Sequence, residues 1–376
     1  MASRWTERCS SLLRTGSMAR AEWQTRTSLN FSSDSWSVDD VPDQSGKVFL
    51  ITGGNTGLGL ATAKVLLARN ARVYITSRDR ERGQQALHML RRISESIHVL
   101  ELDLADLHSV RKAAHEFMRR ERHLHVLINN AGVLCPPLTH LTRQRYDLQF
   151  GVHVLGHFYL TKLLLPVLLS TAKHSAQKAR VVNYTCAIPH SLCRVDYTTL
   201  MDGPARRKCS LMQLHRQSKL GTLLFSHELA EQYGEQGVVS IAVNPGNVHT
   251  ELMRHATGVE TAFWNMFSHD VSKGVVTPLF AATAPRAESL NGKLLGPDAR
   301  ATDVPASLLA RGAGGGPVGL VGRADGVLRG CGGRRVRGSE LIIMASPFGL
   351  WGGDESHCRR YSHFSQRITV TAARYQ

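Results

Sequence analysis

A glycine-rich turn between an apolar strand and a helix constrains this chain more than any other segment. Residues 48–52 form a short apolar run typical of a buried β-strand, and residues 58–68 repeat apolar side chains at helical spacing. The turn between them contains Gly53, Gly57 and Gly59. Glycine tolerates positive φ and close backbone approach to a ligand, and the free N–H groups at a helix start attract a pyrophosphate. The segment therefore predicts a dinucleotide site.

A second apolar run, residues 71–77, completes a strand–helix–strand unit and is followed by Arg78. Sites that prefer NAD more often have an acidic side chain at this strand end, where it binds the ribose hydroxyls. A guanidinium can instead bind two oxygens of a 2′-phosphate. A solvated surface arginine is the alternative interpretation. Directly after this unit, Arg78 predicts NADP(H) as the cofactor.

Strand-like and helix-like segments continue to alternate along the chain. Residues 97–103 and 124–128 are predicted strands, residues 107–120 are a predicted helix, and the sequence NNAG follows at 129–132. This alternation predicts an α/β fold with a doubly wound parallel sheet of the Rossmann type. Ligands of such sheets bind beyond the carboxyl ends of the strands, so the loops there are expected to carry the chemistry.

Several motifs occur in the order typical of the short-chain dehydrogenase/reductase superfamily. They are TGGNTGLG, LDL, NNAG, FGVHVLGHFYLT, ARVVN, SK and NPGNVHT. From about residue 46 to about residue 297 the chain resembles this superfamily, most closely the retinol-dehydrogenase-like and WW-domain-oxidoreductase-like branches. The resemblance implies NADP(H) binding and proton-coupled hydride transfer between a carbonyl or alcohol and nicotinamide. The implied cofactor contacts are Gly53, Asn55, Gly57, Leu58, Gly59, Arg78, Asp103, Leu104, Asn130, Ala131, Gly132, Lys219 and Thr250.

The chain departs from the superfamily at the residues that move the proton. The resemblance implies a tyrosine that donates or removes the proton and a lysine that lowers its pKa and holds the nicotinamide ribose. It also implies a serine that orients the substrate oxygen and an asparagine that kinks a helix and positions a water. The matching positions hold His215, Lys219, Cys186 and His153, so only the lysine is retained. No tyrosine of the chain has a lysine four residues later.

His215 and Lys219 are four residues apart and therefore share a face of the predicted helix. Imidazole is suited to proton transfer near neutral pH. The neighbouring ammonium, however, lowers its pKa and depletes the proton-donating form. The thiol of Cys186 is a weak hydrogen-bond donor. The hydroxyl of Thr185 cannot replace it, because neighbouring side chains of a strand point to opposite faces of the sheet. Either these side chains have a new catalytic role or they simply occupy the cavity. Turnover should be slower than in an enzyme with the family's own residues by about 10²- to 10⁴-fold or more.

The two ends of the chain differ in composition from the domain expected over residues 46–305. Residues 1–45 are rich in serine and arginine and lack hydrophobic periodicity. Their arginine content resembles a mitochondrial transit peptide, but a flexible extension of a cytoplasmic protein is the preferred interpretation. Residues 311–376 begin with a glycine- and arginine-rich stretch that has too few apolar side chains to bury a core. We therefore expect a single domain with flexible extensions at both ends.

Other features exclude several kinds of site. The seven cysteines show no C-x-x-C spacing, so reduced thiols are expected. His153 and His157 have the spacing of a metal pair, but no third ligand is marked nearby and no metal is predicted. No window reaches the roughly 18 apolar residues of a transmembrane helix, and residues 154–169 are interpreted as a buried or dimer-forming helix.

Three functions remain compatible with the sequence. The first is an NADP(H)-dependent oxidoreductase with weak activity on a lipophilic carbonyl or alcohol. The second is a catalytically silent NADPH-binding protein that acts as a sensor or interaction partner. The third, an RNA-associated protein, rests only on the formal net charge of +16 and the tail, and no specific nucleic-acid partner is predicted.

Overall fold

The computed structural model describes residues 36–186, 194–246 and 271–309, without residue 307. The described residues up to Val304 belong to one compact unit, and those from Pro305 belong to a second. The predictions for Thr250, for residues 1–35 and for the tail 311–376 lie outside the described residues.

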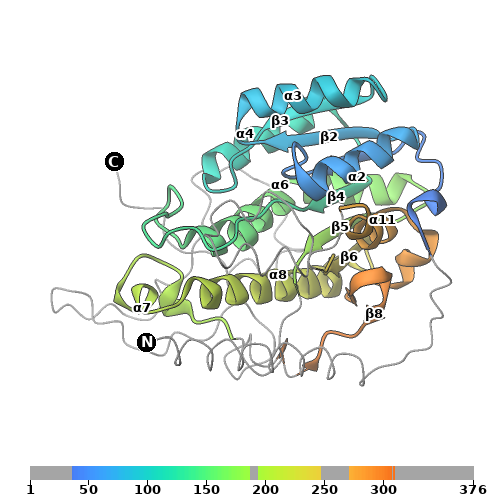
Figure 1. Ribbon diagram of the computed structural model, residues 1–376. Coiled ribbons are helices and arrows are strands. Elements are labelled where there is room, and N and C mark those ends of the chain that lie inside the picture. Colours follow the sequence, from blue (N-terminus) through green and yellow to red (C-terminus); the bar gives the residue numbers. More distant parts are fainter. Residues whose placement is uncertain (1–35, 187–193, 247–270, 307, 310–376) are drawn as a thin grey trace, which may run out of the picture. The chain divides into compact units, whose positions relative to one another are not determined.

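The described residues of the first unit form one eight-stranded sheet in the order β3-β2-β1-β4-β5-β6-β7-β8 (Figure 1). All neighbouring strands are parallel except β7 and β8. The strands are β1 (Val48–Ile51), β2 (Arg72–Ser77), β3 (Ile97–Glu101), β4 (Val126–Asn129), β5 (Ala179–Tyr184), β6 (Val238–Val243), β7 (Leu294–Leu295) and β8 (Ala301–Thr302). Every residue of β1, β4, β5 and β6 is buried, as expected where helices cover both faces of a sheet.

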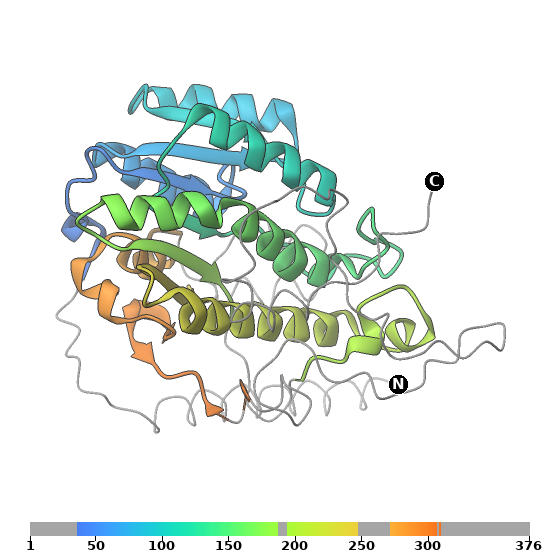
Figure 2. The same ribbon diagram turned by 180° about the vertical axis from the view of Figure 1, so that it is seen from behind.

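Helices cover both faces of this sheet. One face carries α2 (Gly57–Ala68), α3 (Arg80–Arg91) and α11 (Val276–Thr283), seen in front in Figure 1. The other carries α4 (Leu107–Arg120), α6 (His157–His174) and α8 (Leu211–Tyr233), and Figure 2 shows α4 and α6 from that side. The shorter helical segments are η1 (Val38–Asp40), α5 (Leu148–Phe150), η2 (Gly151–Gly156), η3 (Tyr197–Thr199), α7 (Pro204–Arg207), α10 (Val271–Gly274), η5 (Pro285–Ser289) and η6 (Pro297–Ala299). The chain reverses its winding between β1 and β4, which is where such sheets bind ligands.

The packed unit begins before the boundary predicted at residue 46. Trp36 meets Phe280 of α11 edge to face, with 5.4 Å between the ring centroids. Val41 and Gln44 are fully buried, although the sequence suggested a flexible extension here. A few isolated apolar side chains produce no periodic signal, and contacts with distant elements bury them. Residues 36–45 are therefore part of the domain.

One long apolar helical segment runs from Leu148 to His174 and combines α5, the π-helix η2 and α6. Among the described residues it is the one helix long and apolar enough to cross a membrane. However, 61% of its most apolar window is buried inside the protein, as in the core helix of a globular domain. The burial agrees with the interpretation of residues 154–169 as a buried helix.

Candidate functional site

The glycine-rich turn leaves the carboxyl end of β1 and enters α2. Gly53 and Gly57 have φ angles of +63° and +53°, which side chains larger than hydrogen rarely allow. At Gly59, an added Cβ would lie 2.5 Å from the carbonyl oxygen of Gly53 and 2.6 Å from Nδ2 of Asn130. The close backbone approach in this turn therefore requires glycine at these positions.

The neighbouring strands hold the turn from both sides. On one side, Thr76 of β2 accepts the N–H of Gly53 at Oγ1 (3.2 Å) and the N–H of Gly54 at its carbonyl oxygen (3.1 Å). On the other, Asn130 follows β4 and donates from Nδ2 to the carbonyl oxygens of Thr52 (2.7 Å) and Gly53 (3.3 Å). The NNAG sequence thus supports the shape of the glycine turn.

The amino end of α2 lacks the side-chain cap that α3, α4 and α8 have. Those helices begin after Asp79, Asp106 and Ser210, and each of these side chains accepts an N–H of the first turn. Thr56, at the start of α2, makes no such bond. The first N–H groups of α2 are therefore available to an anion, which the helix dipole also stabilises. A dinucleotide pyrophosphate fits this arrangement.

The glycine turn and the loop after β4 together form the dinucleotide cradle. His157 of α6 connects this cradle to the helices behind it. Its Nδ1 donates to the carbonyl oxygen of His153 (3.1 Å), so its Nε2 accepts from the hydroxyl of Thr52 (2.9 Å). That hydroxyl oxygen accepts the N–H groups of Asn130 (2.9 Å) and Ala131 (3.0 Å). Burial lowers the pKa of His157 to about 3, so the ring stays neutral. No cluster of three metal ligands occurs among the described residues, and His157 orders the loop instead.

The remaining expected cofactor residues lie beyond the same edge of the sheet. Arg78 is exposed directly after β2. Asp103 follows β3 and accepts the N–H of Ala105 at Oδ1 (2.9 Å). Leu104 is buried against η2, where an added Cβ at Gly156 would lie 2.6 Å from its carbonyl oxygen. Asn55 and Leu58 in the turn, and Gly132 in the loop after β4, are also partly buried.

His153 lies in the π-helix η2 and has both ring nitrogens occupied. Its Nε2 accepts the N–H of Val133 (3.0 Å), so Nδ1 carries the proton and donates to Oγ of Ser218 (2.8 Å). Ser218 in turn donates to the carbonyl oxygen of His215 (2.7 Å). Burial, followed by the charge of Lys219, holds the pKa of His153 well below its usual value. His153 therefore joins η2 and α8, and neither nitrogen remains for a substrate.

His215 lies on α8 with its Nδ1 3.0 Å from Oε1 of Gln149. The amide of Gln149 is oriented by two further bonds, from Nε2 to the carbonyl oxygen of Leu211 (2.9 Å) and from the N–H of Cys135 to Oε1 (3.1 Å). An amide oxygen only accepts, so His215 carries its proton on Nδ1. Burial first, and then the charge of Lys219, lower the pKa of His215 to about 3. The imidazole is therefore neutral at physiological pH.

Lys219 lies one helical turn after His215 and donates from Nζ to the carbonyl oxygen of Tyr184 (3.0 Å). Burial lowers its pKa to about 8, and Cys186 opposes this effect. Cys186 is partly buried directly beyond β5. The hydroxyl of Thr185 donates to the carbonyl oxygen of Lys219 (3.0 Å), which ties it to the backbone of α8. Lys219 and Cys186 thus lie at the carboxyl end of β5. His215, one turn earlier on α8, meets the ring of His153 edge to face, with 5.5 Å between the centroids.

Comparison with known proteins decides the family. Residues 47–190 match the family model described as short chain dehydrogenase. A short-chain dehydrogenase/reductase of Armillaria gallica is 44% identical over 266 residues, which cover 70% of this chain and 85% of that protein. The chain belongs to the short-chain dehydrogenase/reductase family.

The branch and fold of this short-chain dehydrogenase/reductase follow from two further comparisons. Retinol dehydrogenase 12 of Mus musculus is 40% identical over 253 residues, which cover 66% of this chain and 77% of that protein. The structure of an NADPH-bound carbonyl reductase from chicken fatty liver has a TM-score of 0.53 at 21% identity and covers 69% of this chain and 100% of its own. The expected family, retinol-dehydrogenase-like branch and doubly wound fold are confirmed.

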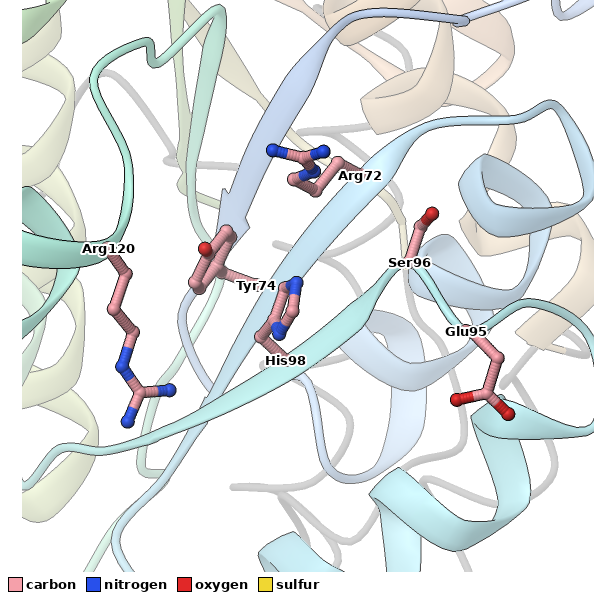
Figure 3. Close-up of a pocket in the computed structure, with 6 residues that line it drawn as sticks. All are labelled: Arg72, Tyr74, Glu95, Ser96, His98 and Arg120. Atoms are coloured by element: carbon pink, nitrogen blue, oxygen red, sulfur yellow. The ribbon is translucent and has the colours of Figure 1, made fainter.

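A separate hollow of about 640 Å³ lies at the opposite end of the strands (Figure 3). Arg72, which begins β2, and Ser96, which precedes β3, place it at the amino ends of these strands. The rings of Tyr74 and His98 stack there with 4.6 Å between centroids. Ligands of doubly wound sheets bind at the other edge, so the hollow is distinct from the dinucleotide cradle of this short-chain dehydrogenase/reductase.

Sequence reasoning missed the side chains that orient the site. Gln149, Thr52 and Ser218 were not selected, and His157 was considered only as a metal ligand. The contacts of Gln149 with His215 and of Thr52 with His157 join residues 66 and 105 positions apart. Local periodicity carries no signal for such pairs.

Proposed function

We propose that this short-chain dehydrogenase/reductase uses NADP(H) to interconvert a lipophilic alcohol and its carbonyl compound, with low turnover. The observation that carries the proposal is the glycine turn, held by Thr76 and Asn130 and followed by an uncapped helix start, with Lys219 retained on α8. Bound NADP(H) would supply or accept the hydride. The name of the similar retinol dehydrogenase 12 supports a lipophilic alcohol as the substrate class.

Each part of the cofactor has candidate partners along the sheet edge. The glycine turn and the first N–H groups of α2 would hold the pyrophosphate. Arg78 would bind the 2′-phosphate, and Asp103 and Leu104 would contact the adenine. Residues 130–132 would follow the adenosine ribose and diphosphate, and Lys219 would hold the nicotinamide ribose. Thr250, which lies outside the described residues, would contact the nicotinamide amide.

Proton transfer is the slow part of the proposed reaction. With a pKa of about 3, His215 is almost entirely unprotonated at pH 7. Lys219 has a pKa of about 8 and remains mostly protonated at that pH, so it is the group that still has a proton to donate. Cys186 would orient the substrate oxygen less well than a serine, because a thiol is a weak hydrogen-bond donor.

A second candidate is NADPH binding without turnover. It is favoured by His153, whose two ring nitrogens both have protein partners, and by the neutral state of His215. In that case the protein would act as a nucleotide sensor or interaction partner. The RNA-associated function has no support from the described residues. A homodimer and a cytoplasmic location remain predictions.

A paired measurement separates the two candidates. NADPH binding is followed by fluorescence, and NADPH oxidation is screened with aldehydes, ketones and retinoids. Turnover that Lys219→Met abolishes would support the oxidoreductase, whereas tight binding without turnover of any of these compounds would support the silent protein. Absence of NADPH binding would contradict both.

A further inference from the structure

The two nitrogens of His215 face different surroundings. Nδ1 donates to Gln149, so Nε2 of the neutral ring carries a lone pair. Nε2 has no hydrogen-bond partner among the described residues. Of the side-chain atoms without a partner, those that are fully buried do not include Nε2. Nε2 therefore opens toward accessible space. At this position the site offers only a hydrogen-bond acceptor, whereas a tyrosine hydroxyl could also donate.

We propose that Gln149 is a positioning residue that makes His215 a hydrogen-bond acceptor, so that the site binds the alcohol form of its substrate in preference to the carbonyl form. The inference rests on the proposed function, because it takes the substrate oxygen to meet His215. An alcohol hydroxyl donates to Nε2, whereas a carbonyl oxygen has only lone pairs and would face another lone pair. Lys219 can donate to either oxygen and therefore does not discriminate between them.

Gln149 is rigidly held, which is what a positioning role requires. Gln149 is 1% exposed, and its amide group makes hydrogen bonds with Leu211, Cys135 and His215. The opposite amide orientation would set its NH₂ group against the N–H of Cys135 and its oxygen against the carbonyl oxygen of Leu211. Both contacts would be unfavourable, so the three bonds select one orientation.

A buried ion pair anchors the segment around Gln149. Nε of Arg206 lies 3.0 Å from Oδ2 of Asp147, and both side chains are 2% exposed. Arg206 also donates to the carbonyl oxygen of Leu138 (2.7 Å), and Asp147 accepts the N–H of Phe150 (3.0 Å). These bonds connect α7, the loop after β4 and the start of α5. The amide of Gln149 therefore has little freedom to rotate away from His215.

The first test reads the tautomer of His215 directly. In protein with ¹⁵N-labelled histidine, NMR should show the proton of His215 on Nδ1, with the signal assigned by its loss in His215→Gln. His125 is an internal reference, because its Nδ1 accepts the N–H of Val48 (3.0 Å) and its own proton must lie on Nε2. Gln149→Leu should release His215 from the Nδ1–H form. A proton on Nε2 in the wild-type protein would overturn the proposal.

The second test measures the preference for an alcohol over a carbonyl compound with two ligands that cannot react. Protein saturated with NADP⁺ is titrated with a long-chain methyl ketone and with the tertiary alcohol made by adding a methyl group to its carbonyl carbon. NADP⁺ cannot reduce the ketone, and the alcohol has no carbinol hydrogen to lose. The wild type should bind the alcohol about tenfold more tightly, since one hydrogen bond is gained and an unpaired acceptor avoided. Equal affinities, or tighter ketone binding, would contradict the proposal.

Variants of Gln149 test whether it causes the preference. Gln149→Leu should abolish it, and Gln149→Glu should shift it toward the ketone, because a carboxylate favours an imidazolium that donates from Nε2. Gln236→Leu is the matched control, since this glutamine is exposed and bonds only within its own chain segment. An alcohol preference that survives in folded Gln149→Leu would overturn the role of Gln149. NADP⁺ binding is measured separately, and its absence would contradict the proposed function, while the tautomer measurement needs no cofactor.

Discussion

The dinucleotide cradle and the proposed proton-transfer site share one edge of the sheet but depend on different parts of the chain. The cradle consists mainly of backbone groups, which Thr76, Asn130 and Thr52 hold in place. The proposed proton-transfer site depends on the identity of side chains, and at the positions matched to the family's acid, serine and asparagine the chain has His215, Cys186 and His153. Backbone geometry survives substitution of neighbouring side chains, whereas a proton donor does not. A family member can therefore keep the features of its cofactor site while its acid–base chemistry changes.

Restoring the family side chains should produce the largest change. His215→Tyr combined with Cys186→Ser should raise carbonyl reduction by about 10²- to 10⁴-fold, because it restores proton delivery and carbonyl orientation beside Lys219. His153→Asn should add a smaller gain, since it also removes the bonds to Val133 and Ser218. Single changes should achieve less than their combination. The measurement is steady-state NADPH oxidation.

Two outcomes with these variants would contradict the contrast between a retained cofactor cradle and an altered proton-transfer site. If the triple variant binds NADPH but reduces nothing, the substrate pocket has also changed, and a binding role becomes the better explanation. If the wild type is already fast and His215→Ala abolishes its activity, His215 is a working acid and the proton-transfer site is not impaired.

Lys219 should show opposite effects on stability and on turnover. Its pKa falls from 10.5 in the unfolded chain to about 8 in the folded protein, so folding is penalised below pH 8 and the penalty disappears as the pH rises through 10.5. Lys219→Met should therefore stabilise the cofactor-free protein at pH 7 by up to about 3 kcal/mol and lose turnover. Denaturant unfolding across this pH range tests it. If the stability gained by Lys219→Met does not shrink with rising pH, the gain does not come from the pKa of Lys219.

Gly59 tests whether the cradle depends on backbone approach. An added Cβ would meet the carbonyl oxygen of Gly53, which cannot move without distorting the turn. Gly59→Ala should weaken NADP(H) binding by about 10- to 100-fold, corresponding to an overpacking cost of about 1–3 kcal/mol. Gly203→Ala is the control, because nothing lies within 4 Å of its added Cβ and its φ of 176° is extended. Unchanged affinity in Gly59→Ala would place the nucleotide elsewhere.

Arg78 should have the smallest effect, limited to the choice between nucleotides. Arg78→Ala should weaken NADP(H) binding about tenfold and leave NAD(H) binding nearly unchanged, because a charge-assisted contact to the 2′-phosphate is lost. Titration of both nucleotides against wild type and variant gives the ratio. Equal affinities for the two nucleotides in the wild type would contradict the assignment of Arg78.

The alternation of strands and helices was readable from sequence because it depends on local periodicity. The predicted strands at 48–52, 71–77, 97–103 and 124–128 lie within two residues of β1, β2, β3 and β4, and the predicted helix 107–120 coincides with α4. The proposed substitutions at the proton-transfer positions also rest on local sequence, since they lie inside recognisable motifs. Residues 36–45 were misassigned because their burial depends on contacts with distant elements such as α11.

The sequence by itself determined the doubly wound sheet and the glycine turn, because these depend on residues close together in the chain. It also led to the proposed assignment of His215, Cys186 and His153 to the proton-transfer positions. Only the tertiary structure decided what those side chains can do. The proton of His215 is assigned by Gln149, 66 residues away, and both nitrogens of His153 are engaged by Val133 and Ser218. A hydrogen-bond pattern selects a tautomer only when burial excludes water as a competing partner. That burial exists only once the helices have packed on the sheet.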